Sequence, residues 1–359
     1  MEKLKLALIG CGRMGAFTSD TVKKYSPSCW FPMSHLDAAI KIDNIEIVAV
    51  CDKSNSTLLK IKKYYGVKNV YNNYLDMLKN EKIDILSIAT RTPGRSKIIF
   101  DAVSNGINSF HVEKPICNST NELKKLEALS YRKKLNITYG TLRRYLDIYI
   151  KAKLIIDSKK YGALKEIDID FGHDKLMWLH PHSIDTILFF AGDQYPLYVQ
   201  SLLSNFNYCR IKNKKELLID KDPTLEFANL FFKNKLFARI SNRGDMDVIL
   251  HCEKGIIIIE ADGKNLFVKK VKAHKSPYKK YKKEKIKVKQ KNIGGTGSAL
   301  SLHLNKKGKK YMINSETIFK GQKILFSLVK SHLEKSSLVE PKKMKEKITI
   351  NGKYKNFYA

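Results

Sequence analysis

The chain opens with LKLALIGCGRMG at residues 4 to 15. The first half of this segment is predominantly apolar and predicts a buried strand, and the second half matches the pattern G-x-G-x-x-G. In that pattern Gly10 permits a tight turn, Gly12 lets the backbone approach a pyrophosphate, and Gly15 lets a helix pack closely on the strand. The motif predicts that a dinucleotide is held by Gly10, Cys11, Gly12, Arg13, Met14 and Gly15.

Apolar runs and helical patterns alternate through the first third of the chain. The apolar runs are Ile45 to Cys51, Ile83 to Ala89, Ser109 to Val112 and Asn136 to Tyr139. The helical patterns are Ser54 to Tyr64, Arg95 to Ser104 and Thr120 to Lys133. Because the runs are continuously apolar, helices should cover both faces of a parallel sheet. Residues 1–140 are therefore predicted to form a doubly wound α/β domain of the Rossmann type that binds NAD(P).

Beyond Tyr145 the pattern changes to apolar runs that follow one another closely. These runs are Ala163 to Phe171, Leu225 to Phe232, Leu236 to Ser241, Asp247 to Cys252 and Gly255 to Glu260. Short connections of this kind are typical of antiparallel strands. Helices from Pro181 to Ala191 and from Glu316 to Leu333 are expected to cover the sheet. Residues 141–359 are predicted to form an α+β domain on a largely antiparallel open sheet, whose C-terminal tail packs back on the first domain.

The end of the second apolar run bears on the choice of cofactor. Asp52 follows that run, and its carboxylate would accept hydrogen bonds from a ribose 2'-hydroxyl and repel a 2'-phosphate. NAD is therefore expected in preference to NADP. Asp52 lies far beyond the usual distance of about 20 residues from the glycines. The excess is Ala16 to Pro32, which predicts an inserted loop before a helix that begins near Ser34.

The net charge of +32 would ordinarily suggest nucleic acid as a partner. However, 58 of the basic residues are Lys and only nine are Arg, and Arg is preferred for bidentate contacts to phosphates and base edges. Lys269 to Lys291 holds twelve lysines and one acid, with Tyr278 and Tyr281 as its aromatic residues. The segment is predicted to be either a solvated edge strand and loop or a functional patch. Its composition argues against a nucleic-acid site, although a lysine-dependent nucleic-acid-binding protein stays an alternative.

The six cysteines are scattered, with neither a CxxC pair nor a Cys/His cluster at zinc spacing. We therefore expect reduced thiols and no metal. No apolar run approaches the roughly 18 residues that span a bilayer, and the run near the N-terminus is too short for a signal peptide. The chain is expected to be cytoplasmic, with no membrane partner.

Two later motifs add to the glycines. Ala89-Thr90-Arg91-Thr92-Pro93 closes the fourth predicted strand, and His111-Val112-Glu113-Lys114-Pro115 closes the fifth. With these motifs the chain resembles the Gfo/Idh/MocA family of oxidoreductases, and the resemblance extends over about residues 4 to 193. It implies hydride transfer between NAD(P) and a sugar, cyclitol or nucleotide-linked sugar, with the substrate held between the nicotinamide and the open face of the second sheet. It also implies that Thr90, Thr92, Pro93 and Glu113 contact the cofactor.

Two groups are candidates for the chemistry. Lys114, at a strand end, is predicted to stabilise negative charge on the reacting oxygen. His182, in the first turn of a helix, is predicted to be the general base, and Asp185 three residues on to hold its tautomer. The resemblance implies that Lys114, Arg144, His180 and His182 contact the substrate, which could be anionic.

The chain departs from the family at two places. The carboxylate that relatives commonly carry about one turn before the histidine is replaced by Trp178 and Leu179. The base is then His182 alone, or with help from Asp185, His180 or Asp174. Arg95 stands where many relatives have a histidine, and would bind an anionic group or cap a helix.

One alternative keeps the cofactor and changes the reaction. The chain would bind NAD(H) and use transient hydride transfer for epimerisation or elimination, or act as a sensor. In either case relatives often associate through the open sheet, so a homo-oligomer is expected.

Overall fold

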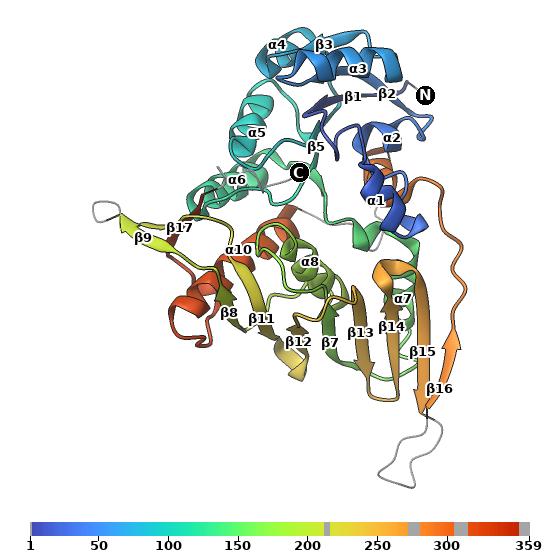
Figure 1. Ribbon diagram of the computed structural model, residues 1–359, viewed down its shortest axis with the longest axis vertical. Coiled ribbons are helices and arrows are strands. Elements are labelled where there is room, and N and C mark those ends of the chain that lie inside the picture. Colours follow the sequence, from blue (N-terminus) through green and yellow to red (C-terminus); the bar gives the residue numbers. More distant parts are fainter. Residues whose placement is uncertain (1, 212–215, 272–280, 305–314, 352–359) are drawn as a thin grey trace.

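A computed structural model describes residues 2–211, 216–271, 281–304 and 315–351. In these ranges the chain forms two large sheets and one small one, with the first large sheet at the top of Figure 1 and the second at the bottom.

The first sheet has six parallel strands in the order β3-β2-β1-β4-β5-β6. The strands are β1 (Leu4–Ile9), β2 (Ile45–Cys51), β3 (Asn69–Tyr71), β4 (Ile85–Ile88), β5 (Ser109–Val112) and β6 (Asn136–Tyr139). Its helices are α3 (Asn55–Tyr65), α4 (Tyr74–Asn80), α5 (Arg95–Ser104) and α6 (Thr120–Lys133). The strand order reverses between β1 and β4, and ligands of such sheets bind at the carboxyl ends of the strands near this point.

The second sheet has eight strands in the order β16-β15-β14-β13-β7-β12-β11-β8. They are β7 (Leu164–Asp170), β8 (Tyr198–Ser204), β11 (Thr224–Phe231), β12 (Phe237–Ile240), β13 (Asp247–Cys252), β14 (Gly255–Glu260), β15 (Asn265–Val271) and β16 (Tyr281–Lys285). Every pair is antiparallel except β7 with β12. Helices α8 (His180–Phe190) and α10 (Ser315–Leu333) pack together over this sheet.

The predicted fold class, a parallel Rossmann sheet followed by a largely antiparallel one, is confirmed. The strands that the sequence did not predict are β3, β8, β15, β9 (Tyr208–Ile211), β10 (Glu216–Ile219) and β17 (Lys347–Ile350). β16, at the edge of the second sheet, lies in the lysine-rich segment for which an edge strand is one of two interpretations. β3 has only three residues, and β15 and β16 carry lysines that break the apolar pattern. These strands are specified by their neighbours in the sheet rather than by their own residues.

The last strand connects the end of the described chain to the first half of the protein. β17 pairs with β10 in the small sheet β17-β10-β9. Thr349 also forms an isolated bridge with Ser119, the N-cap of α6, and the Ile350 N–H donates to Asn118 O at 2.9 Å. This end of the chain therefore packs on the base of α6.

The insertion after the glycine motif is present, and it is more than a loop. It contains helix α1 (Asp20–Tyr25) and the 3-10 turn Ser28–Trp30. Helix α2 (His35–Ala39) then begins at Ser34, as the sequence predicts, and the Ser34 hydroxyl accepts a hydrogen bond from Asp37 N–H. The His35 N–H donates to Met14 O at 2.8 Å, so α2 continues the turn that the insertion interrupts.

The insertion also reaches the second sheet. Trp30 Nε1 donates to Asp262 O at 2.9 Å, and Cys29 Sγ lies 3.5 Å from Gly263 O in the turn between β14 and β15. Figure 1 shows α1 above the ends of these strands. The insertion therefore bridges the two large sheets.

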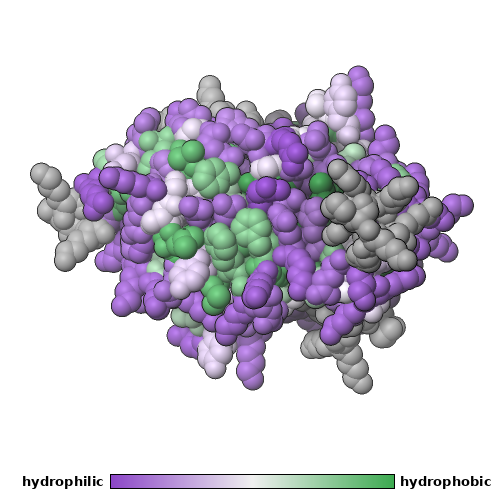
Figure 2. Space-filling model, turned by 90° about the horizontal axis from the view of Figure 1, so that it is seen from below, coloured by the Kyte–Doolittle hydropathy of each residue, from purple (hydrophilic) through white to green (hydrophobic). Residues whose placement is uncertain are grey.

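The surface agrees with the composition. Seen from below in Figure 2, the molecule is mostly hydrophilic, with apolar side chains gathered in a few patches. Among the described residues, every helix falls short of the length and apolarity needed to cross a bilayer.

Candidate active site

The glycine turn leaves room for a ligand at one position only. A side chain on Gly15 would place its Cβ 1.9 Å from Gly10 O, and one on Gly10, whose φ is +91°, would place it 2.8 Å from Ala89. At Gly12 a Cβ would meet nothing within 4 Å. Gly12 therefore faces open space, which fits the close approach of a pyrophosphate to its backbone.

Asp52 supports this turn. One carboxylate oxygen accepts a hydrogen bond from the Cys11 N–H at 2.8 Å, and the other accepts from the Ser54 N–H at 2.9 Å. A carboxylate offers about four acceptor sites, so each oxygen keeps capacity for a ribose hydroxyl. The residues present therefore fit a dinucleotide.

Lys114 lies at the end of β5 with its ammonium in the protein interior. The side chain is only 7% exposed. Nζ donates to Trp178 O at 2.6 Å and stands 3.6 Å from the centre of the Trp178 ring. Burial lowers the pKa of Lys114 to about 8. The group is thus a partly desolvated cation of the kind found at reacting oxygens.

Arg95 fixes the ends of β4 and β5, next to Lys114. This differs from the two roles expected for Arg95, binding of an anionic group and capping of a helix. Its guanidinium is fully buried and donates to the carbonyl oxygens of Thr90, Glu113 and Pro115. Burial lowers its pKa to about 10. Arg95 therefore neither binds an anionic ligand nor caps a helix, because it ties β4 to β5. Thr90, Thr92 and Pro93 lie in the turn that it anchors.

Glu113 is also internal, and its expected contact with the cofactor stays a prediction. It is 1% exposed, and one carboxylate oxygen lies 3.2 Å from His35 Nε2. The other accepts the Lys114 N–H at 3.3 Å, and the carboxylate fills the space beside Gly140. His35 Nδ1 in turn lies 2.7 Å from Ser87 Oγ. Glu113 thus links the start of α2 to the backbone of Lys114.

His182 lies at the start of α8, close enough to Lys114 for the ammonium to act on it. Its pKa is well below the usual value because of burial, with further lowering by Arg143 and Lys114. Nδ1 has no hydrogen-bond partner among the described residues. The low pKa keeps the ring neutral, as a general base requires, and Nδ1 is itself a buried atom. His180 is fully buried, with Nδ1 3.0 Å from Ser183 Oγ, and burial lowers its pKa to about 3.

The expected roles of Asp185 and Arg144 are corrected together, because the two residues pair with each other. Arg144 Nε donates to both carboxylate oxygens of Asp185, at 2.9 and 3.0 Å, and Arg144 Nη2 lies 3.1 Å from Asp193. Arg144 is 1% exposed. Asp185 therefore holds an arginine rather than the ring of His182, and the guanidinium of Arg144 is committed to two carboxylates.

The neighbouring Arg143 is a site residue that the sequence analysis missed. It is 3% exposed, and Nε and Nη2 bind Asp262 at 2.8 and 2.9 Å. The guanidinium carbon lies 4.2 Å from the Phe171 ring centre and 4.9 Å from that of Trp30. Nη1 has no partner in the described part of the chain. Only the Arg-Arg pair after a strand signalled this residue, and nothing local distinguishes its two members.

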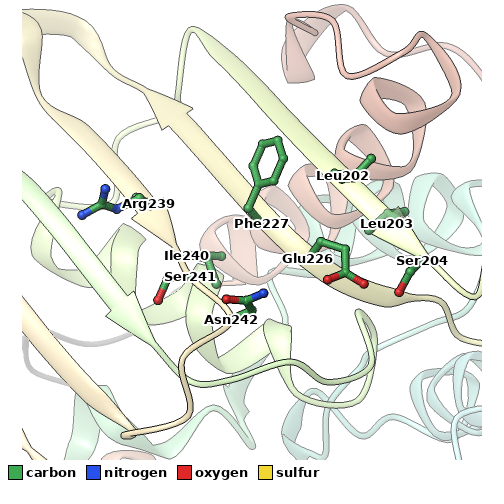
Figure 3. Close-up of a pocket in the computed structure, with 9 residues that line it drawn as sticks. All are labelled: Leu202, Leu203, Ser204, Glu226, Phe227, Arg239, Ile240, Ser241 and Asn242. Atoms are coloured by element: carbon green, nitrogen blue, oxygen red, sulfur yellow. The ribbon is translucent and has the colours of Figure 1, made fainter.

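The candidate site built on Lys114 and His182 lies where α8 begins, and a substrate against the open face of the second sheet stays a prediction. That face has its own shallow depression of about 660 Å³, shown in Figure 3. Leu202, Phe227 and Arg239 lie along it on β8, β11 and β12. Lys114 and His182 are not among its lining residues.

The lysine-rich segment is described only in part, because residues 272–280, with Tyr278, lie outside the described ranges. Of the rest, Lys270 and Lys282 pair with Glu284, Lys283 with Glu260, and Lys291 with Asp147. No group of three or more His, Cys, Asp or Glu side chains in the described ranges could hold a metal ion.

Comparison with known proteins finds a family model that matches the part of the chain that forms the first sheet. Residues 4–141 match the model of GFO_IDH_MocA, an oxidoreductase family with an NAD-binding Rossmann fold. D-apiose dehydrogenase of Paraburkholderia graminis is 30% identical over 107 residues, 30% of this chain and 24% of that protein. Inositol 2-dehydrogenase of Salmonella typhimurium is 24% identical over 161 residues, 44% of this chain and 43% of the relative. The chain thus matches less than half the length of these relatives.

The fold as a whole has solved counterparts. An oxidoreductase from Agrobacterium radiobacter, crystallised with NAD+, L-tartaric acid and magnesium, superposes with a TM-score of 0.71. The identity is 15%, over 95% of this chain and 99% of the other. At this identity the likeness establishes the shared fold of both sheets.

The two glycines of the turn give a matched pair of variants. Gly15→Ala should lower the free energy of unfolding by about 1–3 kcal/mol, because its Cβ would collide with the backbone. Gly12→Ala should leave stability within about 0.5 kcal/mol, because its Cβ meets open space. It should nevertheless weaken NADH binding by roughly tenfold or more, about 1.4 kcal/mol.

Denaturant unfolding and calorimetric titration with NADH measure the two effects. A Gly12→Ala variant that binds NADH as tightly as the wild type would show that the dinucleotide does not approach this turn.

Proposed function

We propose a function from one premise: residues 4–141 belong to the GFO_IDH_MocA oxidoreductase family, with its NAD-binding Rossmann fold. The protein is an NAD(H)-linked dehydrogenase or reductase that acts on a hydroxyl or keto carbon of a sugar, cyclitol or nucleotide-linked sugar. The observation that carries this proposal is the buried ammonium of Lys114 beside the neutral ring of His182. The names of the relatives, dehydrogenases of D-apiose and inositol, support a polyol or sugar substrate.

The chain supplies the proton chemistry, and the nicotinamide, when bound, supplies the carbon that accepts or returns a hydride. Lys114 exchanges its hydrogen bond to the Trp178 carbonyl for one to the reacting oxygen, and its charge stabilises the developing alkoxide. His182 accepts the hydroxyl proton at a ring nitrogen during oxidation and returns it during reduction. Its burial keeps the ring neutral and ready to accept this proton.

Arg143 extends the site toward an acidic substrate. Two of its nitrogens are neutralised by Asp262, and Nη1 is left with a proton to donate. A guanidinium edge recognises a carboxylate or phosphate oxygen better than a neutral hydroxyl. We therefore place an anionic group of the substrate on Arg143.

A second candidate function is favoured because no hydrogen bond to Nδ1 fixes the imidazole ring of His182. Nothing in the described chain binds its Nδ1, and Asp185 is committed to Arg144. An imidazole without a fixed tautomer suits reversible proton exchange, as in epimerisation or elimination by transient hydride transfer. Either enzyme would have the two-domain division at residue 140 and associate with copies of itself through the open sheet.

Replacing the two proposed reacting groups tests the mechanism. Lys114→Ala and His182→Ala should each reduce turnover by about 10²-fold or more, the effect of losing a positioned acid-base or electrostatic group. NADH binding should persist. In the wild type, kcat/KM should fall as pH rises through about 8, because the Lys114 ammonium then loses its proton.

Matched controls are Lys153→Ala and His251→Ala, which remove a lysine paired with Asp157 and a histidine paired with Asp168. Steady-state kinetics with a panel of sugars and sugar acids gives the readout. Normal turnover in Lys114→Ala would contradict the mechanism at its most specific residue.

The cofactor preference depends on the charge of Asp52. We expect NADH to bind more tightly than NADPH, and Asp52→Asn to narrow the difference, because it removes the repulsion of a 2'-phosphate at nearly constant size. Asp52→Ala should also narrow the difference in affinity between NADH and NADPH. In addition it removes the hydrogen bond that the Cys11 N–H donates to Asp52. Calorimetric titration with both dinucleotides decides, and tighter binding of NADPH by the wild type would reject the assignment.

Arg143→Gln tests the class of substrate. It should raise KM for an acidic substrate by roughly tenfold, the effect of losing one charged hydrogen bond, with a smaller change for the neutral analogue. An equal loss of affinity for the acidic substrate and its neutral analogue would show that the anionic group does not bind Arg143. Because Asp262 loses its partner, a thermal melt accompanies the kinetics.

A further inference from the structure

The segment that precedes α8 is held by the segment that precedes β11. Lys175 and Thr224 form an antiparallel bridge, and Lys175 Nζ also donates to Thr224 Oγ1 at 2.9 Å. Leu176 N–H donates to the Pro223 carbonyl at 2.8 Å. This pairing brings Asp222 to the turn just before His182.

The Asp222 carboxylate accepts hydrogen bonds from two consecutive backbone amides. One oxygen accepts the Met177 N–H at 2.8 Å, and the other accepts the Trp178 N–H at 3.0 Å. The residue is 6% exposed, so water does not compete for these bonds. Hydrogen bonds to an ionised carboxylate are stronger than neutral ones, and a side-chain amide could accept at one atom only. The backbone of Trp178 is therefore fixed by the charge and the shape of this carboxylate.

Trp178 in turn provides the contacts given above for Lys114, its carbonyl oxygen and the face of its ring. We propose that Asp222 is a positioning residue for Lys114: by holding the backbone of Trp178, it fixes the carbonyl and the ring that keep the ammonium in place. The importance of this for turnover rests on the proposed function, in which Lys114 binds the reacting oxygen.

The pKa of Asp222 shows that its carboxylate and the Lys114 ammonium act on each other. Burial raises the pKa of Asp222 to about 7, while the two amides and the charges of Lys175 and Lys114 act in the opposite direction. Asp222 thus lies within electrostatic reach of the Lys114 ammonium. It supplies, from another part of the chain, a carboxylate that Trp178 and Leu179 do not provide in the turn before His182.

The test measures Lys114 directly and needs no substrate. The protein is acetylated with trace acetic anhydride, and peptide mass spectrometry compares Lys114 with Lys153, a lysine on α7 (Asp147–Asp157) that is 8% exposed and paired with Asp157. Asp222→Asn should raise the ratio of Lys114 to Lys153 labelling by roughly tenfold, the factor that corresponds to about 1.4 kcal/mol. The increase follows because a loosened Trp178 no longer shields the amine.

Asp222→Glu separates position from charge. It keeps the carboxylate but moves its oxygens by one methylene, so labelling should rise here too. A rise in Asp222→Asn alone would mean that Asp222 acts only through its charge on the pKa of Lys114, and would overturn the positioning role. Labelling at the wild-type level in Asp222→Glu overturns it as well, and this variant decides alone if Asp222→Asn does not fold.

Thr224→Val is the matched control, because it removes the bond to Lys175 in the same paired segment without touching the two amides. It should label like the wild type, and a rise equal to that of Asp222→Glu would show general loosening of the segment and overturn the specific role of Asp222. Once a substrate is known, both Asp222 variants should lower kcat more than they raise KM. Raised labelling together with normal turnover in Lys114→Ala would leave the positioning role intact and reject the proposed function instead.

Discussion

The burial of one ammonium group constrains the site more than any other interaction. Taking the charge of Lys114 out of water is costly unless polar groups replace its hydration. The replacements are the Trp178 carbonyl at 2.6 Å, the face of its ring at 3.6 Å, and the nearby negative charges of Glu113 and Asp222. Each must be held rigidly to be useful, so the turn before α8, the segment before β11 and the end of β5 have to meet at one point. The arrangement of the two sheets is therefore inseparable from the placement of this cation.

Arg95 meets the same constraint in a different way. It has no acid as a hydrogen-bond partner, and its two terminal nitrogens donate to three carbonyl oxygens just beyond the ends of β4 and β5, while Nε has no partner in the described part of the chain. Carbonyl groups at strand ends have no partner in the sheet and would otherwise be buried unsatisfied. The charge and the carbonyls therefore satisfy each other, and the backbone on either side of Lys114 is fixed as a result. A histidine at this position could not donate to three separate oxygens.

The sequence predicted what depends on local order along the chain. The glycine turn, the strand ends and the helix that begins at Ser34 follow from spacing and turn chemistry within a few residues, and they are present. The partners of the charged side chains could not be predicted in the same way. Arg144 and Asp185 are 41 residues apart, and Arg143 and Asp262 are 119 apart. Which member of the Arg143-Arg144 pair faces the site depends on the turn between β6 and α7, not on the identity of either residue. Asp222 lies in a loop with no motif, and only the contact with Met177 and Trp178 reveals it.

The composition of the chain is a poor guide to its site for a related reason. The net charge of +32 comes from lysines, yet most of the buried cations described above have a dedicated acid. Arg144 binds Asp185 and Asp193, Arg143 binds Asp262, and Asp222 lies within reach of Lys114. Buried charge has to be balanced where it lies, whereas surface charge is screened by salt over about 10 Å. The excess of lysine is therefore a property of the surface. The selectivity of the site must come from the few donors that its acids leave unpaired, such as Arg143 Nη1 and the Lys114 ammonium once it leaves the Trp178 carbonyl.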